Sequence, residues 1–140
     1  MKKTNNKGFS LVELIVVIAI MAVLIVVAAP QFLKYVEDSR RAKDIQMASS
    51  LHTAYLADIA DGEITTSVTT PAEITASTKP TTMATTPAVS GRLTTATTFY
   101  YTCDVVDGTA TIYVGTSADP DAFTLTTEAG ATTYKNATNP

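Results

Sequence analysis

The feature of the sequence that most limits its fold is an apolar run from Phe9 to Ala29, which only Ser10 and Glu13 interrupt. As a helix these 21 residues would span about 31 Å, close to the roughly 30 Å hydrocarbon core of a bilayer. A chain of 140 residues can hardly cover such a segment on every side within a soluble core. The run therefore predicts a membrane-inserted helix, and the lysines before it place the N-terminus in the cytoplasm and the rest outside.

The segment before the run, residues 1–8, is short, polar and basic. An ordinary secretory signal would be cut after its apolar region, next to small residues. Ala28-Ala29 offers a poor version of that site because Pro30 follows it, and the apolar run continues into a helical pattern without a break. We therefore expect the apolar helix to be kept.

The residues at this junction, positions 7–15, are KGFSLVELI. They resemble the N-terminal signature of type IV prepilins and of the related pseudopilins of type II secretion and DNA-uptake machines. A basic leader, a junction glycine, a phenylalanine after it and a glutamate fifth in the mature chain coincide here. The resemblance covers about residues 1–60. It implies that a membrane prepilin peptidase removes residues 1–8 by cutting between Gly8 and Phe9, and that the new N-terminal Phe9 is N-methylated.

Glu13 needs a physical reason, because a carboxylate in hydrocarbon is costly unless it is paired or protonated. A carboxylate at a helix start gains under about 1 kcal/mol from the macrodipole, which is too little to offset burial. The resemblance implies another role. Glu13 of an incoming subunit would pair with the Phe9 amine of its neighbour and set the axial register of a filament.

Pro30 directly follows the apolar run and predicts a kink, because proline removes a backbone donor and clashes with the preceding turn. In the family, the matching proline ends a stretch that can lose helical structure on assembly. Many members carry a glycine where this chain has Ala22, so whether residues 22–30 melt here stays open.

Beyond Pro30, apolar residues recur at three- and four-residue spacing, which predicts a helix with one apolar face. The residues of this face are Ile45, Ala48, Leu51, Tyr55 and Ile59. We expect one long helix over residues 9–61, of which residues 9–29 form the transmembrane segment and filament core. The apolar face of the second half should pack on a head.

Charges of both signs lie near the expected membrane exit. They are Lys34, Glu37, Asp38, Arg40, Arg41, Lys43 and Asp44. Such a belt is usually a solvated surface with weak i,i+4 pairs. In a filament the same charges would pair between subunits, and the sequence leaves both interpretations open.

The head is expected over residues 62–140, with a threonine-rich connecting loop at 62–93 that contains at most a short strand. Asp107-Gly108 is a strong two-residue turn signal between two alternating segments, and this turn pairs Cys103 with Ile112. Ala129-Gly130 offers a second turn, so residues 97–135 predict an antiparallel sheet of three to five strands. The expected fold class is α+β and pilin-like, with the long helix packed on this small sheet.

Enzymatic, cofactor-binding and nucleic-acid-binding functions are not expected. The net charge of −3 gives no sign of a basic face, and we find no phosphate loop, no paired Cys/His ligands and no nucleophile with a base. Asp119 and Asp121 are weak calcium candidates in a loop, but a full ligand set is missing and solvated turn residues are the preferred interpretation. His52 is expected to have a packing or surface role, and Cys103, the sole cysteine, to be a buried apolar residue.

The resemblance implies a structural subunit of a type IV pilus. The precursor would sit in the cytoplasmic membrane and then polymerise through its N-terminal helix into an extracellular filament for adhesion, motility or a related surface function. Its partners would be further copies of itself, the prepilin peptidase and a membrane assembly machinery. The alternatives are a pseudopilin of a type II secretion or DNA-uptake apparatus, and a membrane-anchored exterior binding domain that does not polymerise. Glu13 argues against the last, because a simple anchor has no use for that charge.

Overall fold

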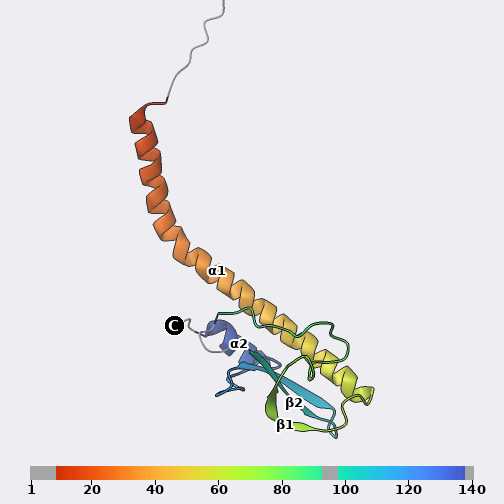
Figure 1. Cartoon of the computed structure of the whole chain (residues 1–140). Helices are drawn as coiled ribbons and strands as arrows, with labels where there is room; N and C mark the ends of the chain where they lie inside the picture. The colour runs from red at the N-terminus through yellow and green to blue at the C-terminus, as the bar shows by residue number, and fades with distance from the viewer. Residues whose placement is uncertain (1–8, 93–97, 138–140) are drawn as a thin grey trace, which may run out of the picture. The chain divides into compact units, whose positions relative to one another are not determined.

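The computed structural model describes residues 9–92 and 98–137, so the junction residue Gly8 lies outside the described residues. The elements, in chain order, are α1 (Leu11–Ala60), β1 (Val68–Glu73), β2 (Thr98–Asp104), β3 (Thr109–Gly115), β4 (Phe123–Thr124) and α2 (Glu128–Asn136) (Figure 1). The chain divides into two compact units, Met1–Val36 and Glu37–Pro140, and α1 contributes to both.

In the first unit, α1 is an apolar helix whose side chains are not covered by any other part of the chain that the structure describes. Every residue from 9 to 35 is exposed, including Leu24 at 62% and Val26 at 75%. Pro30 lies inside α1, and the helix continues through it. Residues 22–30 are therefore helical in the separate chain, whereas the kink at Pro30 and any melting on assembly stay predictions.

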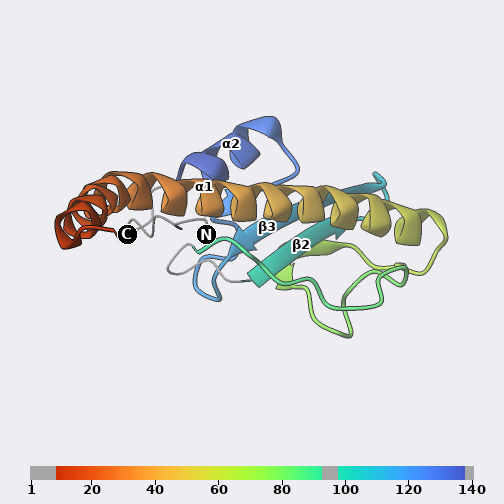
Figure 2. The same ribbon diagram turned by 90° about the horizontal axis from the view of Figure 1, so that it is seen from above.

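In the second unit, the strands form one antiparallel sheet in the order β1-β2-β3-β4. The second half of α1 crosses over β2 and β3, and α2 lies alongside it (Figure 2). A helix layer on a small antiparallel sheet confirms the predicted α+β class and a strand number within the expected range. β1 lies within the expected connecting loop, where only a short strand was foreseen.

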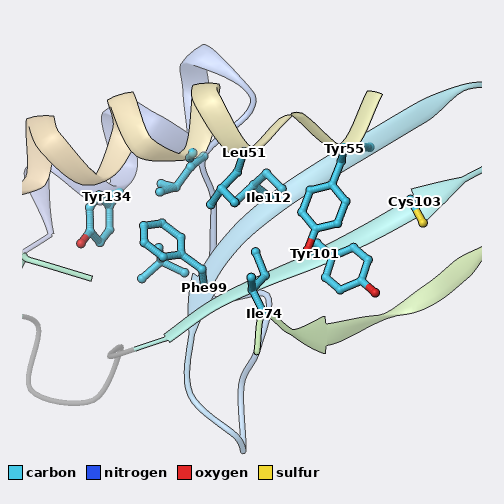
Figure 3. Close-up of a cluster of buried hydrophobic side chains, with 12 residues drawn as sticks. Leu51, Tyr55, Ile74, Phe99, Tyr101, Cys103, Ile112 and Tyr134 are labelled. Carbon is cyan, nitrogen blue, oxygen red and sulfur yellow. The ribbon is translucent and has the colours of Figure 1, made fainter. Parts of the chain in front are cut away.

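The core fills the space between α1 and the sheet (Figure 3). Leu51 and Tyr55 of α1 are fully buried, and the Tyr55 ring stacks on the Tyr101 ring with centroids 4.4 Å apart. Phe99 and Ile112 complete this layer from β2 and β3. The apolar face predicted for the second half of the helix is thus confirmed, since its aliphatic and aromatic members are buried or half-buried against the sheet.

The predicted register of the β2–β3 hairpin is wrong by two residues. Cys103 pairs with Ala110 and not with Ile112, because the turn has four residues, 105–108, in place of two. The Asp104 carboxylate ends β2 early by accepting the backbone N–H groups of residues 106 and 107, at 2.9 and 3.3 Å. Gly108 closes the turn at φ +63°. A shift of two keeps every side chain on its face, so the predicted inward face is correct.

The predicted second turn and strand near the C-terminus are also wrong. Residues 128–136 form α2, and Ala129-Gly130 lies in its first turn. The Thr127 side chain caps this helix by accepting the Gly130 N–H at 3.2 Å. Glu128 in the first turn and Lys135 in the last suit the helix dipole, a local signal that the strand interpretation overlooked.

Candidate functional site

The first candidate site is the exposed apolar part of α1 in the first unit. The helix is long and apolar enough to cross a membrane, and its most apolar stretch is not buried within the chain. Exposure of so many large apolar side chains is unfavourable in water, so this surface requires lipid or protein around it. The predicted cleavage residue Phe9 is 88% exposed at the start of this segment.

Glu13 has a hydrogen-bond partner within its own chain. Its Oε2 accepts the backbone N–H of Ser10 at 3.0 Å, and α1 begins at Leu11. A glutamate that bonds back to a serine three residues earlier is the acidic half of a capping box, which satisfies one of the free donors at a helix start. A carboxylate has room for further donors, so this bond leaves Glu13 able to accept another group.

A second site, which the sequence did not predict, is a buried polar cluster at the start of the head. Arg41 is 3% exposed, and its Nη1 donates to the backbone oxygens of Tyr134 at 3.3 Å and Lys135 at 3.1 Å, and to that of Ala137. Its Nε donates to Glu37 Oε1 at 3.2 Å. Carbonyls at a helix C-terminus lack intrahelical N–H partners, and Arg41 provides a hydrogen-bond donor for those of α2.

Asp44 is 1% exposed and receives three hydrogen bonds. The Ser90 N–H, the Gly91 N–H and the Tyr134 hydroxyl each donate to it at 2.7 Å. A Cβ on Gly91 would lie 2.5 Å from the Tyr134 hydroxyl oxygen and 2.9 Å from Asp44 Oδ2, so any larger residue there would displace one of these side chains. Burial, together with the Asp44 carboxylate, raises the pKa of the Tyr134 phenol well above its usual range.

Carboxylates on α1 also hold the loop between β1 and β2. Asp58, 3% exposed, accepts the Thr81 N–H and hydroxyl, both at 2.7 Å. Asp44 accepts the N–H groups of residues 90 and 91, as described above, and Glu37 accepts the Arg92 N–H at 2.6 Å. Residues later in the loop bind residues earlier in α1, so the loop runs antiparallel to the helix. Below, Glu37, Arg41 and Asp44 are called the Arg41 cluster.

The interpretation of the charge belt as a solvated surface is therefore wrong for Arg41 and Asp44, which are buried. Together with the half-buried Glu37 they bind main-chain groups of their own head, and pairing of these charges between subunits stays a prediction. Positions 37, 41 and 44 continue the three- and four-residue spacing of the buried face, and this spacing was the available signal. For the rest of the belt the two interpretations stay open; these residues are Lys34, Asp38, Arg40 and Lys43.

The remaining sequence candidates lie apart from these sites. Cys103 is free and 4% exposed in the core, as expected. His52 Nδ1 lies 2.9 Å from the Ala110 carbonyl oxygen, which gives it the expected packing role. Asp119 belongs to a turn in which Thr116 N–H donates to its carbonyl at 2.9 Å. Over residues 9–92 and 98–137, no group of three or more Asp, Glu, His or Cys side chains gathers around Asp119, Asp121 or elsewhere to hold a metal.

Comparison with known proteins points to the N-terminal segment. Residues 3–29 match the family described as the prokaryotic N-terminal methylation motif. "Prepilin peptidase-dependent protein A" of Clostridium perfringens is 42% identical over 69 residues, which are 49% of this chain and 49% of that protein. "Type IV major fimbrial protein FimA" of Dichelobacter nodosus is 34% identical over 61 residues, 44% of this chain and 38% of that protein. A "Fimbrial protein" of Pseudomonas aeruginosa is 35% identical over 66 residues, 47% of this chain and 43% of that protein.

The chain thus spans about half or less of the length of these curated relatives. No solved structure matches it significantly. The matched motif contains the junction, Glu13 and the exposed apolar part of α1 described above. Residues 3–29 thus carry the prokaryotic N-terminal methylation motif, and the N-terminal half of the chain is similar to a prepilin peptidase-dependent protein and to type IV fimbrial proteins.

Proposed function

We propose that this chain is the structural subunit of a type IV pilus, which polymerises through the first half of α1 into an extracellular filament. One observation carries the proposal. The helix exposes an unbroken apolar surface over residues 14–29, and one carboxylate, Glu13, lies in the turn before it. Identical helices packed side by side would cover this surface in the filament, as lipid would before assembly. The relatives' names favour a pilus over a pseudopilin apparatus.

Before assembly, the precursor would sit in the cytoplasmic membrane with its N-terminus inside and its head outside. The basic leader supports this orientation, since lysines flanking a spanning helix stay in the cytoplasm. A prepilin peptidase would cut between Gly8 and Phe9, and Phe9 would then be N-methylated. The motif at residues 3–29 brackets this junction, and one relative is named as prepilin peptidase-dependent.

Glu13 would act when a subunit joins the filament. Among the described residues of the separate chain, its carboxylate accepts a neutral donor, the Ser10 N–H, at 3.0 Å. Cutting before Phe9 creates an amine one turn away along the helix, and in an apolar filament core this amine also needs a counter-charge. Pairing Glu13 of one subunit with the Phe9 amine of its neighbour would neutralise both and fix the axial register.

The decisive variant is Glu13→Gln. The amide oxygen can still accept the Ser10 N–H, so the helix start is retained while the charge is lost. Breaking a buried charge pair costs about 3–5 kcal/mol, so we expect filaments to become scarce or absent. Membrane insertion should be unharmed or improved, because one charge has left the spanning helix. Electron microscopy of sheared surface material and immunoblots of the membrane fraction measure the two effects.

Two controls make this result interpretable. Ser10→Ala alters the same turn without altering its charge, and should still give filaments. Mass spectrometry of the wild-type subunit should give a chain that begins at Phe9 and carries one added methyl group. Normal filaments from the Glu13→Gln strain would favour a membrane-anchored exterior domain, and a mature chain that begins elsewhere would overturn the cleavage site.

A further inference from the structure

The C-terminal end of the head is closed without a covalent crosslink. The chain has one cysteine, so an intrachain disulfide is impossible. The Arg41 cluster instead holds two segments that are far apart in sequence. Residues 90–92 donate backbone N–H groups to Asp44 and Glu37, and the carbonyls of residues 134, 135 and 137 accept from Arg41.

Apolar burial alone attaches α2 weakly. Tyr134 is the one buried residue of this helix, and its ring packs edge-on to Phe123 with centroids 5.4 Å apart. Its hydroxyl is in turn held by Asp44. The last turn of α2 thus depends on one aromatic side chain and on the hydrogen bonds of the Arg41 cluster.

We infer that the Arg41 cluster is a closing device, which holds α2 and residues 90–92 against α1 and can open without unfolding the sheet. The cluster begins at Glu37, the first residue of the second unit, so it also fixes where α1 leaves the head. If it opens, the next residue of α1 that packs on the core is the half-buried Ile45. The part of α1 free of the head would then lengthen from Val36 to Asp44, by about two turns.

Hydrogen exchange of the full chain in detergent micelles, followed by mass spectrometry, tests the inference with Asp44→Asn. This substitution keeps the side-chain shape but removes the charge that three donors share. We expect amide exchange in residues 90–92 and 134–137 to accelerate about tenfold or more, since a hydrogen bond to a charged group is worth at least about that factor. Exchange in β2 and β3 should stay within about twofold of wild type.

Two matched variants locate the effect. Lys43→Gln removes an exposed charge next to the cluster and should leave exchange in both segments unchanged. Asp58→Asn removes the carboxylate at the other end of the loop and should accelerate exchange at Thr81 but not in residues 134–137. If Asp44→Asn does not fold, the half-buried Glu37→Gln replaces it, with acceleration expected mainly at Arg92.

Either of two results would overturn the inference. Unchanged exchange in residues 134–137 of Asp44→Asn would show that the cluster does not hold α2. Equal acceleration in α2, β2 and β3 would show that the cluster supports the whole head and is not a separate closing device. Neither readout depends on filaments, so failure here is distinguishable from failure of the proposed function.

Discussion

In the first half of α1 Leu24 is 62% exposed, whereas in the second half Asp44 is 1% exposed, although leucine is the more apolar residue. The two halves belong to one helix but to different compact units. In the first, apolar side chains have no partners among the described residues of their own chain and require lipid or protein around them. In the second, charged side chains are buried because main-chain groups of the head satisfy them. Burial along α1 thus follows the available partners and not hydrophobicity alone.

Removing the central donor of the second half should have the largest effect. Arg41→Met keeps a long side chain but removes the hydrogen bonds that Arg41 donates to Glu37 and to the terminal carbonyls of α2. We expect the free energy of unfolding of the head to fall by about 3–5 kcal/mol, measured by urea denaturation of the full chain in micelles. The exposed neighbour Lys43 provides the control. The free energy of unfolding of Lys43→Met should stay within about 0.5 kcal/mol of the wild-type value. Equal losses of stability in Arg41→Met and Lys43→Met would contradict the distinction between buried and exposed charges of α1.

A matched pair of leucine truncations tests the apolar side of the comparison. Leu51→Ala, at a fully buried position of the second half, should destabilise the head by about 2–5 kcal/mol. Leu24→Ala makes the same chemical change in the first half, and the stability of the head should move by no more than about 0.5 kcal/mol. The same urea titrations give both values. A loss of head stability in Leu24→Ala would mean that the two units are not independent.

The smallest effect is a pH dependence confined to the second unit. Burial raises the pKa of Tyr55 and Tyr134 well above 10.0 in the folded head, whereas in the unfolded chain both should titrate near 10.0. Above that pH the unfolded chain loses protons that the folded head keeps. Stability should therefore be constant with respect to these groups below pH 10 and then fall by about 1.4 kcal/mol per tyrosine for each pH unit.

Urea midpoints at pH 9 and pH 11 measure this decline, and Tyr134→Phe should make it smaller, because Tyr55 and Tyr101, whose pKa burial also raises, remain. A wild-type midpoint that does not move between these two values would contradict the assigned burial of both phenols. The helical signal of the micelle-bound first half should not change over the same range, because that half contains no such buried tyrosine.

Much of the fold followed from local patterns. The length of the apolar run predicted a membrane-inserted helix, and the helix is long and apolar enough to cross a membrane. The three- and four-residue spacing predicted the buried face around Leu51, and alternation predicted the inward faces of β2 and β3. Each of these depends on residues close together in the chain, so the sequence contains the whole signal. The motif around Gly8 and Phe9 is equally local, and comparison with known proteins supports it independently.

Tertiary structure alone decided three features. The register of the hairpin depended on an Asp104 side chain that competes with the ladder for backbone N–H groups. Residues 128–136 carry local helix signals in Thr127, Glu128 and Lys135, but the entry of Tyr134 into the core decides for a helix over a strand. The burial of Arg41 and Asp44 needs main-chain partners about 46 to 96 positions away, and charge in a sequence does not reveal such partners. A charged side chain is buried only when the fold brings matching donors or acceptors to it, and that is a property of the whole head.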